Sequence, residues 1–547
     1  MSAGRGVTLA AAALALVVLV AGLVTAPNYG VTSDEPVIYM GGEWNLWAMQ
    51  ADDPGRWNFK EHRPKEFEKI TRWDYHPDAV GHWAFPGFAG FFCALVAQAA
   101  QHLPGYDVVD AFHAGIVLLH ALAVFAFALY LARLLGARRA LLIAALYALY
   151  PCAVGHSHYN VKDWPMVGFY ALTLVSFACG ILEHRPRFLL QSGFWFGLGL
   201  CSKANPLFAG PTLAVWLPVA WWLTYRHVRK PSRALVAAAL AIPVVGFVTF
   251  WAVWPYVHAG TLAEQARKVG DVFGYILERG RSNRGTFSAY SLFHVAVMTP
   301  PIELFGLLLA AVLPFRKTDG REKSVAALAW MWFLLPVVRI AMPYSNFYDA
   351  NRHFLEYIPA LAVLAGMGLD AGLTAAARWI EPRRPAASKW IPASGLAVVL
   401  GLAAWPVVQY HPFETTYYNA LIGGLGGAQQ KEMSHYFCQG MEFWCPDSEG
   451  DYWGFSFKNA ARDVSREAPN GAKLYACGNL IGPLARWEPL RKDLRMAGRN
   501  EADYFVVIPR RPFCSEDDRR YIAAHTTVVK EERRDGGLVY GVYRRKQ

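Results

Sequence analysis

Long apolar stretches separated by short polar connectors make up the first three quarters of the chain. A helix that crosses a bilayer needs about 20 mostly apolar residues, and the sequence supplies such stretches repeatedly up to about residue 408. The pattern predicts an α-helical polytopic membrane protein with about eleven transmembrane helices. The predicted spans are 7–27, 109–133, 139–155, 164–182, 187–202, 205–225, 234–255, 291–314, 324–342, 354–375 and 389–409.

One more apolar run, 79–103, is ambiguous, and the charges of the connectors decide how it is interpreted. If it is not a full span and the N-terminus is cytoplasmic, every basic connector falls on the cytoplasmic side, as the positive-inside rule requires. Counting it as a span would place all of them outside. We therefore interpret 79–103 as a juxtamembrane or re-entrant segment. The basic connectors contain Arg133, Arg138, Arg139, Arg185, Arg187, Arg226, Arg229, Lys230, Arg233, Arg316, Lys317, Arg321, Lys323, Arg378, Arg383, Arg384 and Lys389.

This topology predicts a protein of the cell (inner or plasma) membrane with a cytoplasmic N-terminus. Residues 7–27 could instead be a cleaved signal peptide, but the stretch is long and no small-residue cleavage box follows it, which favours a retained helix. Residues 1–409 are then a transmembrane domain, in which 28–108 form the first extracytoplasmic loop with juxtamembrane helices. Residues 410–547 form an extracytoplasmic domain.

The polar tail has the pattern of a small α/β domain. It mixes apolar runs such as Tyr504–Ile508 with turn signals such as Asp535-Gly536-Gly537. It also contains four cysteines, and an even number in an oxidising compartment predicts two disulfides with three alternative pairings. A zinc site is the rival interpretation, although the tail has no Cys-x-x-Cys pair. The four are Cys438, Cys445, Cys477 and Cys514.

Composition agrees with a membrane body that carries a soluble part. The chain is 54% hydrophobic, with a mean hydropathy of +0.19 and a formal net charge of +11. A basic protein could bind nucleic acid, but the basic residues cluster between apolar spans and show no interleaving with aromatic residues of the kind that single-stranded nucleic acid needs. We expect no nucleic-acid partner.

Paired acidic residues follow the first span. Ser33 or Asp34 can cap a helix that has Pro36 in its first turn, and Glu35 stands beside them. A carboxylate fixed at a helix start close to the bilayer is also well placed to accept a proton from a sugar acceptor. The two interpretations are compatible.

A dense polar cluster lies between two predicted spans, at residues 150–165. Asp163 can cap the next helix, with Pro165 in its first turn. Capping explains one acidic residue but not the other polar residues crowded beside it. Ionisable groups at the membrane edge are functional candidates. The cluster contains His156, His158, Asn160, Lys162 and Asp163.

Three more motifs place cationic or neutral donors on the same predicted side. They contain His76, Lys203, and the pair Arg352 and His353. A lipid phosphate at the membrane surface needs such partners. Snorkelling to the interface explains any one of them equally well, but their joint occurrence on one side favours a phosphate site. Residues 258–281 form an amphipathic helix that we expect in the interface plane, with a solvated basic end as the alternative.

In this order, the motifs resemble the GT-C glycosyltransferases, in particular the protein O-mannosyltransferase and aminoarabinose transferase (ArnT-like) branch, over nearly the whole chain. The Asp34-Glu35 pair looks like the external acidic motif of that family. His76-Pro77 resembles its Lys/His-Pro-Pro box, with Asp78 in place of the second Pro. Four further segments resemble family motifs. They are Asp163-Trp164-Pro165, Lys203-Ala204-Asn205, Arg352-His353-Phe354, and the tail segment from Tyr417 to Gly454.

The resemblance implies a GT-C fold and an inverting transfer of mannose or a similar sugar from a polyprenyl-phosphate donor to an acceptor hydroxyl. Asp34 would be the base, with Glu35 in the same motif, and Asp163 would orient the acceptor or the base. Lys203, Arg352 and His76 would bind the donor phosphate. His156, His158, Asn160 and His353 are expected to contact donor or acceptor. The partners would be membrane lipid and a protein or glycan acceptor.

Some GT-C relatives use a divalent metal, but the sequence contains no compact ligand box, so we expect metal-independent chemistry without a cofactor. The main rival function is a membrane transporter of a lipid-linked or small anionic substrate. Transporters place ionisable residues near the bilayer midplane, often in repeated halves. Here the polar clusters lie at predicted helix ends, and no internal repeat is found. A structural scaffold would give no reason for paired acids and bases on one face.

Overall fold

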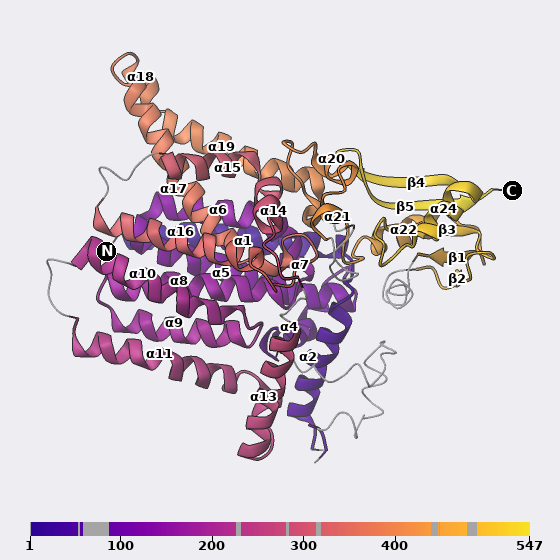
Figure 1. The fold of residues 1–547 in the computed structure, drawn as a ribbon, viewed down its shortest axis with the longest axis horizontal. Helices are drawn as coiled ribbons and strands as arrows, with labels where there is room; N and C mark the ends of the chain where they lie inside the picture. The colour runs from indigo at the N-terminus through magenta and orange to yellow at the C-terminus, as the bar shows by residue number, and fades with distance from the viewer. Residues whose placement is uncertain are drawn as a thin grey trace.

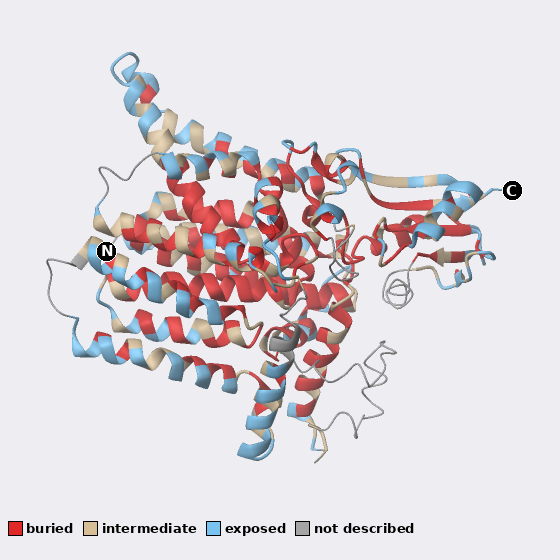
Figure 2. Ribbon diagram, in the orientation of Figure 1, coloured by how far each residue is buried: buried red, intermediate tan, exposed pale blue. Residues whose placement is uncertain are grey.

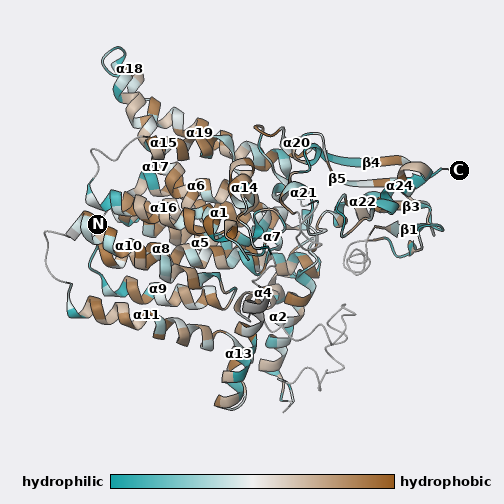
Figure 3. Ribbon diagram, in the orientation of Figure 1, coloured by the Kyte–Doolittle hydropathy of each residue, from teal (hydrophilic) through white to brown (hydrophobic). Residues whose placement is uncertain are grey.

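The computed structural model describes residues 2–52, 55–57, 87–225, 231–279, 284–312, 319–438, 447, 449–477 and 490–546, and most of them are helical. Figure 1 shows a bundle of long helices that run side by side, with a smaller part that contains β-strands at one end of the bundle. The C-terminus lies in this smaller part, and the N-terminus lies at the opposite end of the bundle. Apolar residues predominate on the bundle helices, whereas strand β4 is hydrophilic (Figure 3).

The bundle confirms the predicted polytopic helical membrane protein. Among the described residues, eight helical segments are long and apolar enough to cross a membrane, or up to ten if each of two bent pairs is one span. The eight are Gly4–Asn28, Val108–Leu135, Asp163–Leu182, Asn205–Thr224, Arg233–Ala252, Gly320–Ala341, Tyr357–Ile380 and Ile391–Tyr410. They contain the helices α1 (Ser2–Thr25), α5 (Val108–Leu135), α8 (Asp163–Leu182), α10 (Ala209–Ala220), α11 (Arg233–Ala252), α16 (Gly320–Ala341), α17 (Tyr357–Ile380) and α19 (Ile391–Tyr410).

The two bent pairs coincide with two ranges that the sequence analysis treats as single spans. Helices α6 (Ala137–Leu149) and α7 (Pro151–Tyr159) meet at 64°, and α14 (Tyr290–Met298) and α15 (Pro301–Val312) meet at 114°. In each pair a proline opens the second helix. Proline has no N–H to donate and disfavours helical geometry in the residue before it, so the chain turns there.

The one remaining predicted span, 187–202, corresponds to α9 (Pro186–Leu200), which has 15 residues. At 1.5 Å per residue it is about 22 Å long, shorter than a hydrocarbon core of about 30 Å. It packs between α8 and α11 through small residues. A Cβ added to Gly197 would lie 2.4 Å from the carbonyl oxygen of Gly246, so the two backbones touch, as small residues allow in membrane bundles.

Three helices run across the direction of the bundle at the end that faces the strands (Figure 1). They are α2 (Glu35–Gln50), α4 (Gly87–Ala100) and α13 (Leu262–Arg279). Helix α4, an apolar helix of 14 residues, occupies most of the 79–103 segment, for which the sequence predicts no full span. Helix α13 falls on the predicted amphipathic segment, and Leu262 at its start is 82% exposed. Its placement in the interface plane stays a prediction.

Described residues of several basic connectors meet at the other end of the bundle, where the N-terminus also lies. Glu183, after α8, pairs with Arg133 of α5 and with Arg321 of α16. Arg139 of α6 pairs with Asp370 of α17 at 2.7 Å. These ion pairs bring together connectors that lie far apart in the sequence. The bundle therefore has one basic end and one end that carries the crossing helices and the strands.

The tail contains a five-stranded mixed sheet, which confirms the predicted small C-terminal α/β part. Its strand order is β2-β1-β3-β5-β4, with β1 parallel to β2 and β3, and β5 antiparallel to β3 and β4. The strands are β1 (Lys473–Ala476), β2 (Arg495–Met496), β3 (Tyr504–Val507), β4 (Thr526–Arg534) and β5 (Gly537–Arg545), with helices α22 (Phe457–Glu467) and α24 (Glu516–His525). Cys477 and Cys514 form a disulfide across 37 positions. Cys438 is also disulfide-bonded, and Cys445 lies outside the described residues.

The tail and the bundle share buried structure rather than meeting at a loose hinge. One apolar core contains Tyr29 and Tyr159 from the bundle end together with Phe455, Val506 and Tyr540 from the tail. Figure 2 shows that buried residues continue from the bundle into the tail. In addition, Lys458 of α22 pairs with Asp110 of α5 at 2.7 Å, with 1% and 2% of the two side chains exposed. The predicted boundary at residue 409 stays a prediction.

Candidate active site

Four of the residues singled out from the sequence meet at the end of the bundle that faces the tail. Asp34 is the N-cap residue of α2, and Asp163 is the first residue of α8. Lys203 lies three residues beyond the end of α9, and Arg352 opens the short 3-10 turn before α17. Each side chain therefore stands at a helix end, where backbone groups lack partners within the helix.

Arg352 joins the carboxylates of this cluster. Its Nε donates to Asp163 Oδ2 at 3.1 Å, its Nη1 donates to Asp349 Oδ2 at 2.7 Å, and its Nη2 donates to Asp34 Oδ2. Only 7% of the Arg352 side chain is exposed. A planar guanidinium suits this use because its five N–H groups project in fixed directions. The neighbouring carboxylates raise the pKa of Arg352 above its ordinary value against the opposing effect of burial, so it stays charged.

Asp163 is completely buried and is held on several sides. Lys203 Nζ lies 2.9 Å from Asp163 Oδ1. The side-chain oxygen of Asn160 accepts a hydrogen bond from the Asp163 backbone N–H at 2.8 Å, and the Asn160 amide group lies 3.3 Å from Asp163 Oδ2. A buried carboxylate needs such compensation because burial of an unpaired charge is costly. Asp163 thereby fixes the positions of Lys203 and Arg352.

Asp34 is the accessible carboxylate of the cluster, with 39% of its side chain exposed. Burial acts to raise the pKa of Asp34, but the charges of Arg352 and Lys162 outweigh it, and the pKa lies below the ordinary value. Lys162 Nζ is 3.8 Å from Asp34 Oδ2. Asp34 is therefore an anion that a substrate can reach.

Burial lowers the pKa of Lys203, and the nearby Asp163 carboxylate offsets this only in part. Its side chain is 18% exposed. Lys203 is thus a cation near the rim of the cluster that gives up its proton more readily than an ordinary lysine.

The tail closes one side of the cluster with an aromatic ring. The Arg352 guanidinium lies 4.0 Å from the ring centroid of Trp453, within cation–π range. The Trp453 carbonyl accepts from the N–H of Ser33, next to Asp34. The ring is held there by the buried Asp451, whose carboxylate accepts from the N–H groups of Trp453 at 2.9 Å and Ser456 at 2.7 Å.

Two charged residues of the network escaped the sequence analysis. Asp349 bridges Arg352 and Arg510 of the tail, and both Asp349 and Arg510 are buried. Arg510 also donates to the Tyr452 carbonyl. Asp349 has a positive φ of 56°, and the next residue, Ala350, has one of 53°. Two consecutive non-glycine residues in the left-handed region are unusual and cluster at functional sites, but the sequence carries no signal for them.

Glu35 does not join this cluster, although it follows Asp34 directly. Its carboxylate accepts from the Thr32 N–H and from the Tyr39 hydroxyl, and it lies 3.0 Å from Nε2 of His113. With 1% exposed, Glu35 ties the start of α2 to α5.

The predicted histidines occupy different places. His158 stacks on Tyr29 and bonds Thr25, so it supports the end of α1. His156 bonds the Asn160 side chain at 3.0 Å and stacks on Trp164 behind Asp163.

His353 lies beside the cluster, and its Nε2 has no hydrogen-bond partner among the described residues. Burial lowers the pKa of His353, and the charges of Lys203 and Arg352 add to the effect, so its ring is neutral. His76 lies outside the described residues.

The charges of the cluster favour an anionic ligand. Its three carboxylates, Asp34, Asp163 and Asp349, are paired with four cations, Lys162, Lys203, Arg352 and Arg510. The set therefore carries a net charge of +1, and one of its carboxylates, Asp34, is open to solvent. In the part of the chain that the structure describes, no three His, Cys, Asp or Glu side chains group together to hold a metal ion.

Comparisons with known proteins bear on the fold of the chain. Residues 94–251 match the family model of dolichyl-phosphate-mannose-protein mannosyltransferases. The crystal structure of ArnT from Cupriavidus metallidurans, bound to undecaprenyl phosphate, superposes with a TM-score of 0.50 at 15% identity over 98% of both chains. The apo oligosaccharyltransferase of Archaeoglobus fulgidus gives a TM-score of 0.46 at 12% identity, over 92% of this chain and 69% of that one. No curated protein sequence matches the chain.

Proposed function

Because the chain is a polytopic membrane protein with the GT-C glycosyltransferase fold, similar to ArnT, we propose that it transfers a sugar from a polyprenyl-phosphate donor to an acceptor hydroxyl at the cluster around Arg352. The observation that carries the proposal is the contact of one buried arginine with both an exposed carboxylate, Asp34, and a buried one, Asp163. Such a cluster offers a proton acceptor and phosphate-binding cations within one site.

The proposed step is a single displacement. The acceptor oxygen attacks the anomeric carbon from the face opposite the phosphate, and the acceptor O–H proton passes to Asp34. The bond between the anomeric carbon and the phosphate oxygen breaks, and its electron pair stays on the phosphate. The products are a glycoside of inverted configuration and the polyprenyl phosphate. A positioned base contributes about 10²–10⁴-fold to such a reaction.

Arg352 and Lys203 are proposed to bind the donor phosphate and to stabilise the charge that grows on it. Donors that point to a place where charge develops are effective because they need no rearrangement during the reaction. When a phosphate oxygen replaces Asp34 as the acceptor of the Arg352 Nη2 group, Asp34 loses its ion pair with Arg352 and becomes a stronger base. Donor binding would thus activate the base. Asp163 would act by holding both cations, since it is buried behind them.

The charges at the two ends of the bundle support an assignment of the side of the membrane. The end of the bundle that carries Arg133, Arg139 and Arg321 would be cytoplasmic by the positive-inside rule. The cluster and the tail lie at the opposite end and would be extracytoplasmic, in the inner or plasma membrane.

The donor lipid tail would lie in the bilayer beside α2 and α4, with mannose or a similar sugar on its phosphate. Protein Ser/Thr, a lipid-linked glycan and lipid A-like material are the acceptor classes.

The test is a transfer assay with the purified full chain in detergent. Radiolabelled polyprenyl-phosphate sugars are supplied with a membrane extract, and movement of label from lipid to acceptor is measured. We expect transfer by the wild type and a loss of more than about tenfold in Asp34→Asn. The exposed Asp271 of α13 supplies the matched control, Asp271→Asn, which should transfer normally. Unchanged transfer by Asp34→Asn would move the chemistry to Asp163, whereas no transfer from any donor would contradict the proposal. Transfer in excess EDTA tests the expectation of metal-independent chemistry.

A further inference from the structure

A large groove lies at the basic end of the bundle, far from the cluster around Arg352. It has a volume of about 930 Å³ and is formed by the start of α1, the last turns of α5 and the first turns of α9. Its walls are mainly apolar, with Val7, Leu9, Phe125, Ala126 and Leu129. The reaction proposed above has no use for a site at this place.

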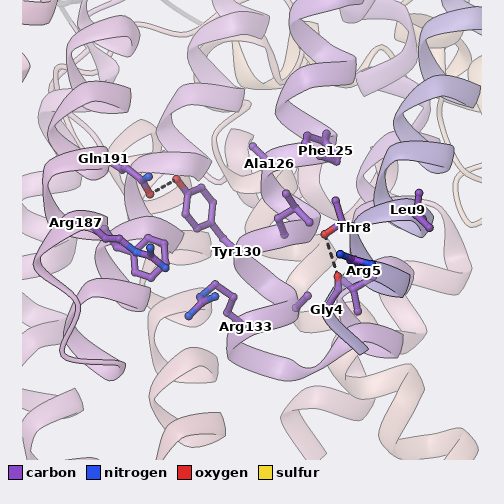
Figure 4. A pocket seen from close by; sticks show the side chains of 14 residues that line it. Gly4, Arg5, Thr8, Leu9, Phe125, Ala126, Tyr130, Arg133, Arg187 and Gln191 are labelled. Atoms are coloured by element: carbon purple, nitrogen blue, oxygen red, sulfur yellow. Dashed lines mark hydrogen bonds between the residues drawn. The ribbon is translucent and has the colours of Figure 1, made fainter. Parts of the chain in front are cut away.

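Three arginines line one part of this groove. In Figure 4, Arg5, Arg133 and Arg187 lie below Phe125 and Ala126, so the charged part and an apolar part of the wall are separate. The guanidinium groups of Arg133 and Arg187 each lie 4.8 Å from the ring centroid of Phe188, so they gather around one ring.

The positive charge of the groove is only partly balanced. Glu183 pairs with Arg133, but it also pairs with Arg321. Within the described part of the chain, no acidic side chain forms an ion pair with Arg5 or Arg187, and both are exposed. The groove therefore combines an uncompensated cationic margin with an apolar wall that continues onto the exposed face of α1, where Leu9 is 70% exposed and Val17 is 65% exposed.

We propose that this groove binds an anionic membrane phospholipid. The phosphate headgroup would lie against Arg5, Arg133 and Arg187, and an acyl chain would lie along α1 and α5. The charge complementarity and the apolar wall of the groove support this occupant. Its residues lie within a few turns of the basic end, so the groove would lie near the headgroups of one leaflet. Basic pockets between transmembrane helices on the cytoplasmic side bind anionic headgroups in this way. The inference does not rest on the proposed transfer reaction.

The experiment is a titration of the purified full chain with dioleoyl phosphatidylglycerol, with bound lipid counted by native mass spectrometry. We expect the wild type to bind one phosphatidylglycerol molecule more tightly than phosphatidylcholine. The double variant Arg5→Gln/Arg187→Gln should bind it about 30-fold more weakly. This is the affinity change expected when two basic residues near an anionic headgroup are removed. The matched control Arg378→Gln/Arg384→Gln removes two exposed arginines at the end of α17 and just beyond it, outside the groove, and should bind as the wild type does.

A second variant, Ala126→Trp, fills the apolar wall without any change of charge and should also weaken binding. Thermal unfolding of each variant checks that it is folded. Equal phosphatidylglycerol binding by the wild type and Arg5→Gln/Arg187→Gln would overturn the proposal, as would phosphatidylcholine binding of equal strength. Displacement of the lipid by undecaprenyl phosphate at much lower concentration than by free phosphatidylglycerol would also overturn it, because the occupant would then be an isoprenoid phosphate.

Discussion

Arg510 of the tail and Asp349 of the loop before α17 form a buried ion pair, with Nη2 2.5 Å from Oδ1 and 2% and 4% of the side chains exposed. Asp349 in turn accepts from Arg352. The tail therefore contributes to the electrostatics of the candidate active site itself. The pair also explains how a loop with two consecutive positive φ angles, at Asp349 and Ala350, is kept in place.

Removal of one partner of this pair should destabilise the protein strongly. We expect Arg510→Gln to lower the free energy of unfolding by about 3–5 kcal/mol, because it leaves the Asp349 carboxylate buried with one cation fewer. Thermal unfolding in detergent measures this. Arg511→Gln is the matched control: Arg511 is 44% exposed, and its pair with Asp447 should contribute at most about 1 kcal/mol. The double variant Arg510→Gln/Asp349→Asn measures the coupling. If its loss of unfolding free energy equalled the sum of the losses in the two single variants, the two residues would not be coupled.

Trp453 should matter for transfer through its contact with Arg352. Trp453→Ala removes the ring that lies 4.0 Å from the guanidinium, and a desolvated cation–π contact contributes about 2 kcal/mol, so kcat/KM for the donor should fall by about 30-fold. Trp453→Phe keeps an aromatic face, so its kcat/KM for the donor should fall less. The control Trp390→Ala alters a tryptophan that is 73% exposed. Equal activity of Trp453→Ala and Trp453→Phe would show that the ring does not act through Arg352.

The pH dependence of transfer should report the environment of Asp34. Since Arg352 and Lys162 hold the pKa of Asp34 below its ordinary value against the effect of burial, the carboxylate stays deprotonated to a lower pH than an ordinary aspartate does. The acid limb of kcat/KM, which reports the free enzyme, should therefore lie below the ordinary pKa of an aspartate. Lys162→Gln removes one of the two charges and should move this limb to higher pH, whereas Lys389→Gln, at the other end of the bundle, should not. An acid limb that Lys162→Gln leaves in place would contradict the assignment.

Much of the fold follows from hydropathy, because a bilayer admits few alternatives to long apolar helices. Prediction from hydropathy fails where the length or bend of a helix depends on the helices packed against it. The range 187–202 looks like a span in the sequence, but its 15-residue helix is held by the close approach of Gly197 to Gly246 on α11. The sharp bend at Pro301 does have a signal in the sequence, because a proline pair interrupts the apolar run 291–314.

The candidate site could be predicted only in part. The sequence singles out four residues that stand at predicted helix ends with polar neighbours, and the structure brings them together: Asp34, Asp163, Lys203 and Arg352. The sequence does not show that two adjacent acidic residues have different partners: Glu35 contacts His113, whereas Asp34 contacts Arg352. Arg510 lies 161 positions from Asp349, and no local pattern marks a partner at that distance.

The disulfide between Cys477 and Cys514 should stabilise the tail measurably. It closes a loop of 37 positions, for which chain entropy predicts a contribution of about 4 kcal/mol. We expect Cys477→Ala/Cys514→Ala to expose the tail to limited proteolysis at lower temperature than the wild type, while the bundle resists.

Cys179→Ala, in the buried core of α8, is the control that should leave proteolysis of the tail unchanged. Because Lys458 and Arg510 tie the tail to Asp110 and Asp349, loosening of the tail should also lower transfer activity. Cleavage of the tail at the wild-type temperature would show that the bridge does not hold it. Loss of the tail with full retention of transfer would contradict its contribution to the site.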